Sequence, residues 1–187
     1  NEEMRPYTIY VDAISKVFAA TGVRVGWSMG PANVLNKMKA ILSHVGAWAP
    51  MAEQKGLTKF LAQGEAIKSY LKHFKSEVEY RLRTIYNGLI ELKGEGYAVD
   101  AVTPEAAIYL TIQFNLVGKK RANGETLQTQ AEVTQYLLQQ AGLAIVPFYA
   151  FGAPADSSWY RLSVGTCKKE EIEEMLGKLK VALQGLH

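Results

Sequence analysis

The chain has 187 residues, of which 48% are hydrophobic and 21% are charged, which suffices for a packed core and a polar surface. The formal net charge of +3 is too small to indicate a nucleic-acid-binding protein, and the longest basic run is Lys119-Lys120-Arg121. The single cysteine, Cys167, excludes an internal disulfide and a thiolate zinc cluster. No apolar run nears the roughly 20 residues of a membrane span. We therefore expect a cytoplasmic protein without a metal, membrane or nucleic-acid partner.

Two short strands and two helices are predicted in the first third of the chain. Residues 8–11 and 23–27 are rich in β-branched and aromatic side chains, so both segments are predicted as strands, with Lys16 on the bend between them. Gly30-Pro31 interrupts the pattern, and the spacing of the apolar residues that follow predicts a helix over 31–45. A break at residues 46–50 precedes a second predicted helix over 51–63.

The middle of the chain is predicted as one long helix over residues 64–93. Its apolar side chains recur at steps of three and four, whereas its lysines fall off that stripe. The stripe consists of Ile67, Tyr70, Leu71, Phe74, Val78, Leu82, Ile85 and Leu89. Gly94 and Gly96 end the pattern.

Strands and helices alternate in the last part of the chain. Strict alternation of apolar and polar residues predicts a strand over 106–116, and further strands are predicted over 143–147 and 159–165. Helices are predicted over 129–140, with Gly142 as a C-cap, and over 168–183. Sequential helix and strand signals of this kind favour an α/β fold.

Lys16 and Arg24 belong to a segment of small residues, Ala13-Ile14-Ser15-Lys16-Val17-Phe18-Ala19-Ala20-Thr21-Gly22-Val23-Arg24-Val25-Gly26. A lysine acts as a nucleophile or base when its surroundings lower its pKa or bind it as an imine. An arginine eight residues later offers a planar fork of donors for a phosphate group. Taken alone, each residue also has an ordinary reading as a surface charge.

The segment resembles the lysine motif of class I/II aminotransferases, pyridoxal-phosphate (PLP) enzymes of fold type I. The resemblance implies that Lys16 forms a Schiff base with pyridoxal 5'-phosphate and that Arg24 holds the cofactor phosphate. One position departs from the family: Ala13 stands where a serine or glycine is usual, so a serine hydroxyl for the phosphate is missing there. No metal ligand is implied.

Arg161 matches the carboxylate-binding arginine of the same family, just before Leu162-Ser163. A guanidinium within a strand needs a partner, and a substrate carboxylate is a suitable one; the alternative is an edge-strand arginine that reaches solvent. Phe148 and Tyr149 are bulkier than the family residues at these places, which indicates either a changed substrate pocket or simple packing. Trp48 likewise fits a contact with substrate or a second subunit, or the filling of a helix junction.

The resemblance predicts an aminotransferase that moves an amino group from an L-amino acid to a 2-keto acid, as a homodimer. The fold expected is the C-terminal part of the PLP-dependent transferase fold: residues 1–63 as the end of the PLP-binding large domain, and residues 64–187 as the interdomain helix and small α/β domain. Two alternatives stay open, another fold-type I reaction such as β-elimination or acyl transfer, and a non-catalytic fragment. Because the family carries much of its large domain before the lysine, the isolated chain is expected to be inactive.

Overall fold

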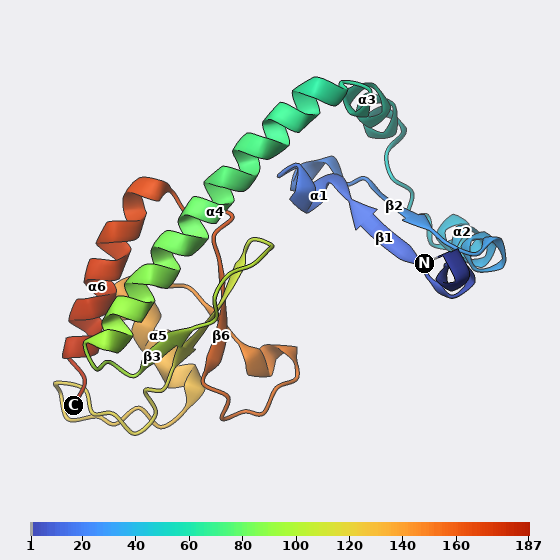
Figure 1. Ribbon diagram of the computed structural model, residues 1–187. Helices are drawn as coiled ribbons and strands as arrows, with labels where there is room; N and C mark the ends of the chain where they lie inside the picture. Colours follow the sequence, from blue (N-terminus) through green and yellow to red (C-terminus); the bar gives the residue numbers. More distant parts are fainter. Residues whose placement is uncertain (1) are drawn as a thin grey trace. The chain divides into compact units, whose positions relative to one another are not determined.

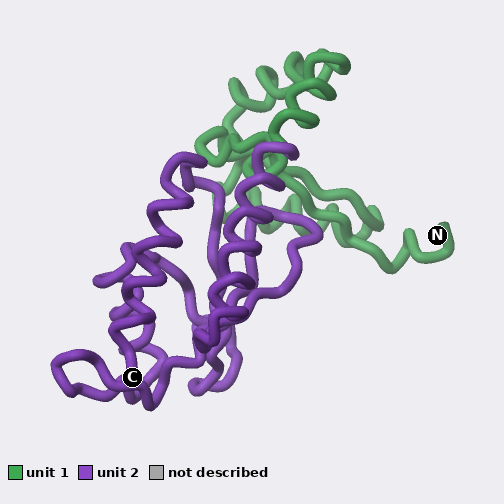
Figure 2. The backbone as a smooth tube through the Cα atoms, turned by 60° about the vertical axis from the view of Figure 1, so that its left-hand side comes forward, with its two compact units in different colours: residues 1–74 green, residues 75–187 purple. Residues whose placement is uncertain are grey.

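The computed structural model describes residues 2–187 and divides into two compact units, Asn1–Phe74 and Lys75–His187 (Figure 2). The first unit begins with the 3₁₀ helix η1 (Glu2–Tyr7) and strand β1 (Tyr10–Ala13). The one-turn helix α1 (Ile14–Val17), the 3₁₀ helix η2 (Thr21–Val23) and strand β2 (Gly26–Met29) follow. Helices α2 (Ala32–Val45) and α3 (Met51–Leu61) precede the long helix α4 (Gly64–Gly94), which begins in this unit.

Strands β1 and β2 form an antiparallel pair in the first unit. Their register places Tyr10 opposite Met29 and Ala13 opposite Gly26, so the residues between Ala13 and Gly26 form a closed turn. Among the described residues of this unit only Ile14 and Val25 are buried, each 6% exposed. The unit therefore has little core of its own, although many of its side chains are apolar.

The second unit contains a four-stranded antiparallel sheet and three helices (Figure 1). The strand order is β3 (Val99–Ala101), β4 (Tyr109–Phe114), β6 (Trp159–Ser163) and β5 (Val146–Pro147). Helix α5 (Gln130–Ala141) follows β4, and the 3₁₀ helix η3 (Phe148–Phe151) follows β5. The 3₁₀ helix η4 (Lys169–Glu171) leads into the last helix, α6 (Ile172–Gln184).

One face of this sheet carries the core of the unit. Burial alternates along β4, where Leu110, Ile112 and Phe114 point inward, and β6 adds Tyr160 and Leu162. These side chains form one cluster with the apolar faces of α4, α5 and α6. The opposite face, which includes Tyr109 and Arg161, is only partly covered.

The helices lie close to where the sequence predicts them. Helices α2, α3, α4, α5 and α6 confirm the expected helices, with ends that differ by a few residues, and Gly142 is the C-cap of α5 with a φ of 66°. Strand β1 has the predicted length but lies two residues later, and the other predicted strands are shorter than expected. The sequence does not predict β3, because three residues are too few to show an alternation.

One strand prediction is wrong at a site residue. The segment 23–27 was predicted as a strand, but β2 begins at Gly26, and Arg24 caps η2 in the left-handed conformation, with φ 59° and ψ 35°. Val23 and Val25 give the segment a strand-like composition. A tight turn nevertheless forms because the Val23 N–H donates to the Ala20 carbonyl at 3.2 Å and Arg24 Nη1 donates to the Thr21 carbonyl at 3.0 Å.

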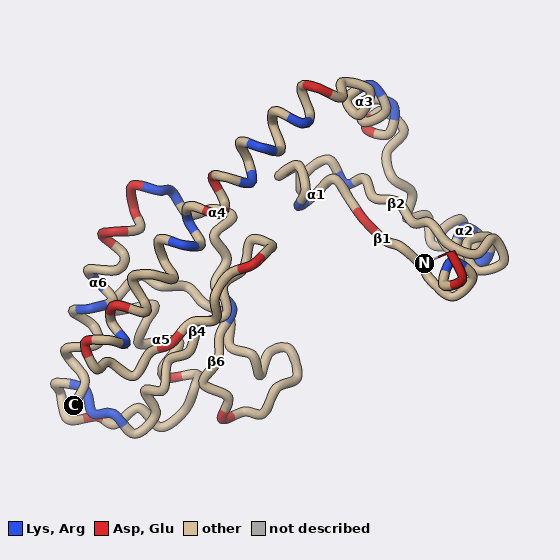
Figure 3. Tube along the Cα trace, in the orientation of Figure 1, with Lys and Arg blue, Asp and Glu red and all other residues tan. Residues whose placement is uncertain are grey.

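The division into units falls within α4, whereas the sequence places the domain boundary between Gln63 and Gly64. The assignment of residues 1–63 and 64–187 to the large and small domains of the family stays a prediction. Basic and acidic side chains both occur along α4 and α6 (Figure 3), and several of them form ion pairs, such as Lys178–Glu174 at 2.7 Å. In residues 2–187 no helix is long and apolar enough to cross a membrane.

Candidate functional site

Lys16 and Arg24 lie on the closed turn between β1 and β2. Lys16 is in α1, which begins at the buried Ile14 directly after the strand residue Ala13. The Ile14 N–H donates to the Val25 carbonyl at 3.2 Å. Both side chains are exposed, and neither takes part in an ion pair within residues 2–187. The structure thus brings an available primary amine and an available guanidinium onto one turn.

The donor set of this turn fits a phosphorylated aldehyde. The Lys16 amine can bond to an aldehyde carbon, and Arg24 uses only Nη1 in its hydrogen bond to Thr21, which leaves its other N–H donors for phosphate oxygens. The Ala13 methyl contributes no donor. Asp12 lies just before the turn, where the Tyr10 hydroxyl donates to its carboxylate at 2.6 Å and the Ala13 N–H donates at 2.7 Å. These bonds hold the pKa of Asp12 below its usual value, so this carboxylate stays ionised.

Arg161 lies on the less covered face of the sheet in the second unit, between two aromatic rings. Its Cζ is 4.5 Å from the ring centroid of Tyr109 and 4.5 Å from that of Phe151. Tyr109 is on β4 and diagonal to Arg161 in the strand register, where Thr111 is directly opposite. Phe151 comes from η3. The two rings cover the guanidinium and leave its terminal nitrogens as the groups available for a ligand.

Arg161 lacks an acidic partner among the described residues, and its Nε is buried without a hydrogen bond. A buried, unpaired donor on a charged group is unfavourable unless an anion or water binds nearby. The arrangement therefore suits a carboxylate. The prediction that Arg161 binds a substrate carboxylate has this support, and the reading as an edge-strand arginine in open solvent does not match its half-buried position.

Sequence reasoning did not find Tyr109 and Phe151. Tyr109 stands in a predicted strand, but which residue it meets depends on the register of β4 against β6, and that register is set by long-range packing. Phe151 is two residues after Tyr149 in an aromatic run, and this local pattern does not reveal a stacking partner. Trp48 is 55% exposed, so it does not fill a helix junction.

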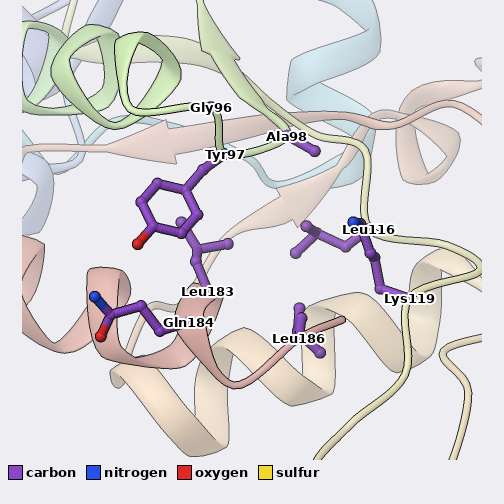
Figure 4. Close-up of a pocket in the computed structure, with 8 residues that line it drawn as sticks. All are labelled: Gly96, Tyr97, Ala98, Leu116, Lys119, Leu183, Gln184 and Leu186. Carbon is purple, nitrogen blue, oxygen red and sulfur yellow. The ribbon is translucent and has the colours of Figure 1, made fainter.

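A cavity of about 360 Å³ lies elsewhere in the second unit (Figure 4). It is lined by residues that follow α4, by Leu116 and Lys119 after β4, and by Leu183 and Gln184 at the end of α6. None of Lys16, Arg24 or Arg161 lines this cavity. Among residues 2–187 no cluster of three or more His, Cys, Asp or Glu side chains is placed to bind a metal ion.

The sequence matches the family model of class I and II aminotransferases over residues 1–179, and the chain belongs to this family. This agrees with the resemblance drawn from the Lys16 segment. The family model covers the lysine turn, the long helix and the strand that carries Arg161.

Individual relatives show the same likeness. The chain is 28% identical over 180 residues to an aspartate aminotransferase of Rhizobium meliloti (strain 1021), a match that covers 96% of this chain and 41% of the relative. It is 28% identical over 180 residues to an aspartate aminotransferase of Bacillus subtilis (strain 168), with 96% and 42% covered. The crystal structure of the Rhizobium meliloti aspartate aminotransferase superimposes with a TM-score of 0.82 at 26% identity and covers 100% of this chain and 44% of that one.

The chain thus spans about two fifths of the length of the curated relatives it matches. An aromatic aminotransferase of Pyrococcus horikoshii, 24% identical with a TM-score of 0.79, shares the fold. These matches confirm the predicted fold class, part of the fold-type I transferase fold.

Proposed function

We propose that this chain is the lysine-bearing part of a PLP-dependent aminotransferase that moves an amino group from an L-amino acid to a 2-keto acid. The single observation that carries the proposal is the pair Lys16 and Arg24, exposed on one closed turn of a chain that belongs to the aminotransferase family. The named relatives are aspartate aminotransferases, which makes aspartate the first amino acid to test.

Each site residue has a role that follows from its chemistry. Lys16 Nζ would hold the cofactor covalently until the substrate amine displaces it, and the freed amine would then take up the proton of the substrate Cα and pass it on. Arg24 would bind the phosphate through the N–H groups not used by Thr21. Arg161 would bind the substrate α-carboxylate through its terminal nitrogens and so fix the direction of the Cα–H bond. Pyridoxal phosphate, when bound, supplies an electron sink for cleavage of a bond at Cα.

The exposed apolar side chains of the first unit support a larger assembly. Tyr7, Val11 and Val45 are 83%, 70% and 71% exposed, which is a high value for apolar residues of a folded unit. We propose that further polypeptide and a second copy, as a homodimer, cover this surface. The isolated chain would then lack part of the site and be inactive.

An isotope-transfer experiment tests this function. The protein encoded by the complete reading frame that contains this chain is incubated with PLP, ¹⁵N-labelled aspartate and a 2-keto acid. An aminotransferase places ¹⁵N on the keto-acid skeleton and requires the keto acid for turnover. A β-eliminating enzyme needs a leaving group at Cβ, which aspartate lacks, so it would release labelled ammonia only from a parallel sample with ¹⁵N-labelled cysteine, without a keto acid. An acyl-transfer enzyme needs an acyl donor. Absence of label on the keto acid, with PLP bound at Lys16, would refute the aminotransferase assignment.

A further inference from the structure

The turn that carries Lys16 and Arg24 has an unfavourable backbone conformation. Ala19 and Arg24 have φ values of 51° and 59°, in the left-handed region where a Cβ atom crowds the following carbonyl. Non-glycine residues stay in this region only where the surrounding structure holds them there. The turn therefore depends on contacts from outside itself.

Tyr70, on the first part of α4, makes such a contact. Its hydroxyl donates a hydrogen bond to the carbonyl oxygen of Phe18 at 3.0 Å, between residues 52 positions apart in the sequence. Its ring stacks on the Phe18 ring, with centroids 6.3 Å apart and planes at 21°, and on the Phe74 ring at 5.9 Å and 6°. Phe60 of α3 meets the Phe18 ring edge-on at 5.3 Å. Two helices thus contact the residue that ends α1.

A single peptide group connects Tyr70 to the backbone of Lys16. The Phe18 carbonyl and the Ala19 N–H belong to the same planar unit. The oxygen side of this unit accepts from Tyr70, and the nitrogen side donates to the Lys16 carbonyl at 3.3 Å. The Phe18 N–H also donates to the Ile14 carbonyl at 3.2 Å and closes α1. A displacement of this peptide plane therefore changes the direction in which α1 presents Lys16.

We infer that Tyr70 is a positioning residue for Lys16: its hydroxyl fixes the peptide plane after α1, and this fixes the amine that binds PLP. The inference rests on the proposed function for the role of Lys16. Ring packing alone would be met by phenylalanine, so the hydroxyl is the specific element. Tyr70 is 39% exposed, which leaves its substitution without a large cavity in the core.

The test compares Tyr70→Phe with Tyr80→Phe, a tyrosine of the same helix that is 50% exposed. Hydrogen exchange of the Phe18 and Ala19 amides is measured in the 187-residue chain, without cofactor. In the complete protein, PLP binding is followed by absorbance, and the induced circular dichroism is measured per bound cofactor. We expect Tyr70→Phe to speed the exchange of both amides by up to about fivefold and to weaken the affinity for PLP by up to about fivefold. A change of this size corresponds to the free energy of one ordinary hydrogen bond. We also expect it to reduce the dichroism, and Tyr80→Phe to leave all three unchanged.

The outcomes separate this inference from the proposed function. Unchanged exchange in Tyr70→Phe overturns the inference, because the hydroxyl then does not hold the peptide plane. Faster exchange with unchanged PLP affinity and dichroism also overturns it, since Tyr70 would then stabilise the turn without positioning Lys16. If the wild-type protein gives no PLP absorbance, the proposed function fails and the positioning role toward the cofactor fails with it, whereas the exchange data still report whether Tyr70 anchors the turn.

Discussion

Removal of the Tyr160 hydroxyl should destabilise the second unit by an amount that its surroundings define. Tyr160 is fully buried, and its hydroxyl donates to Gln130 Oε1 at 2.5 Å. Gln130 is 5% exposed and is the first residue of α5, and its Nε2 donates to the Asp156 carbonyl at 3.1 Å. In Tyr160→Phe the ring keeps its edge contact with Phe114, but Gln130 Oε1 loses its donor away from water.

The expected loss is about 1–3 kcal/mol of the free energy of unfolding, the range for a buried polar group left without its partner. Gln130→Met removes the acceptor. In that background Tyr160→Phe should cost about 1 kcal/mol less than in the wild type, because no buried acceptor is left unpaired. The double-mutant cycle therefore isolates this hydrogen bond from the packing of the ring.

Urea unfolding measures the cycle in a background in which Trp27 and Trp48 are phenylalanine, so that Trp159, next to Tyr160, is the fluorescent reporter. The slope of the free energy against urea should be the same in all variants. Equal losses from Tyr160→Phe in both backgrounds, or a wild-type loss below about 0.5 kcal/mol, would refute the reasoning, since surface substitutions already reach that size.

Three further predictions follow from the structure. Burial raises the pKa of Tyr160 from 10.0 to about 12, so its contribution to stability is complete below pH 10 and is lost as the pH rises toward 12. The free energy of unfolding from urea titrations should fall over that interval by up to about 3 kcal/mol, and Tyr160→Phe should remove this component. Thr129 caps α5 by accepting from the Glu132 N–H at 3.2 Å, so Thr129→Ala should lower the free energy of unfolding by about 1 kcal/mol, and an unchanged urea midpoint would contradict the cap. Arg161→Lys removes the planar fork between Tyr109 and Phe151, so in the complete protein the KM for the amino acid should rise about tenfold or more, whereas an unchanged KM would show that Arg161 does not bind the carboxylate.

The sequence predicted the helices well because their signals are local. The apolar stripe of α4 includes Leu82, Ile85 and Leu89, and all three are buried in the structure. Gly142 shows the same for a helix end, because glycine readily adopts the left-handed conformation of a C-cap. The family of the chain was also within reach, because Lys16, Arg24 and their neighbours follow one another in a short segment.

The details of the site were harder to predict because they depend on distant residues. Arg24 was expected in a strand from its β-branched neighbours, but local hydrogen bonds to Ala20 and Thr21 favour a turn. The aromatic neighbours of Arg161 depend on strand register, and the bond from Tyr70 to Phe18 joins residues far apart in the chain. Neither relation leaves a periodic signal in the sequence.

Covalent capture of the cofactor tests most directly whether Lys16 is the residue that binds PLP. The complete protein and its Lys16→Ala variant are mixed with PLP, reduced with borohydride, digested, and analysed by mass spectrometry. We expect an imine absorption band near the visible edge in the wild type, which reduction removes as it converts the imine to a stable amine. We then expect the phosphopyridoxyl mass on the peptide that contains Lys16, and neither result in Lys16→Ala. The label on another lysine, or equal labelling of the two proteins, would contradict it.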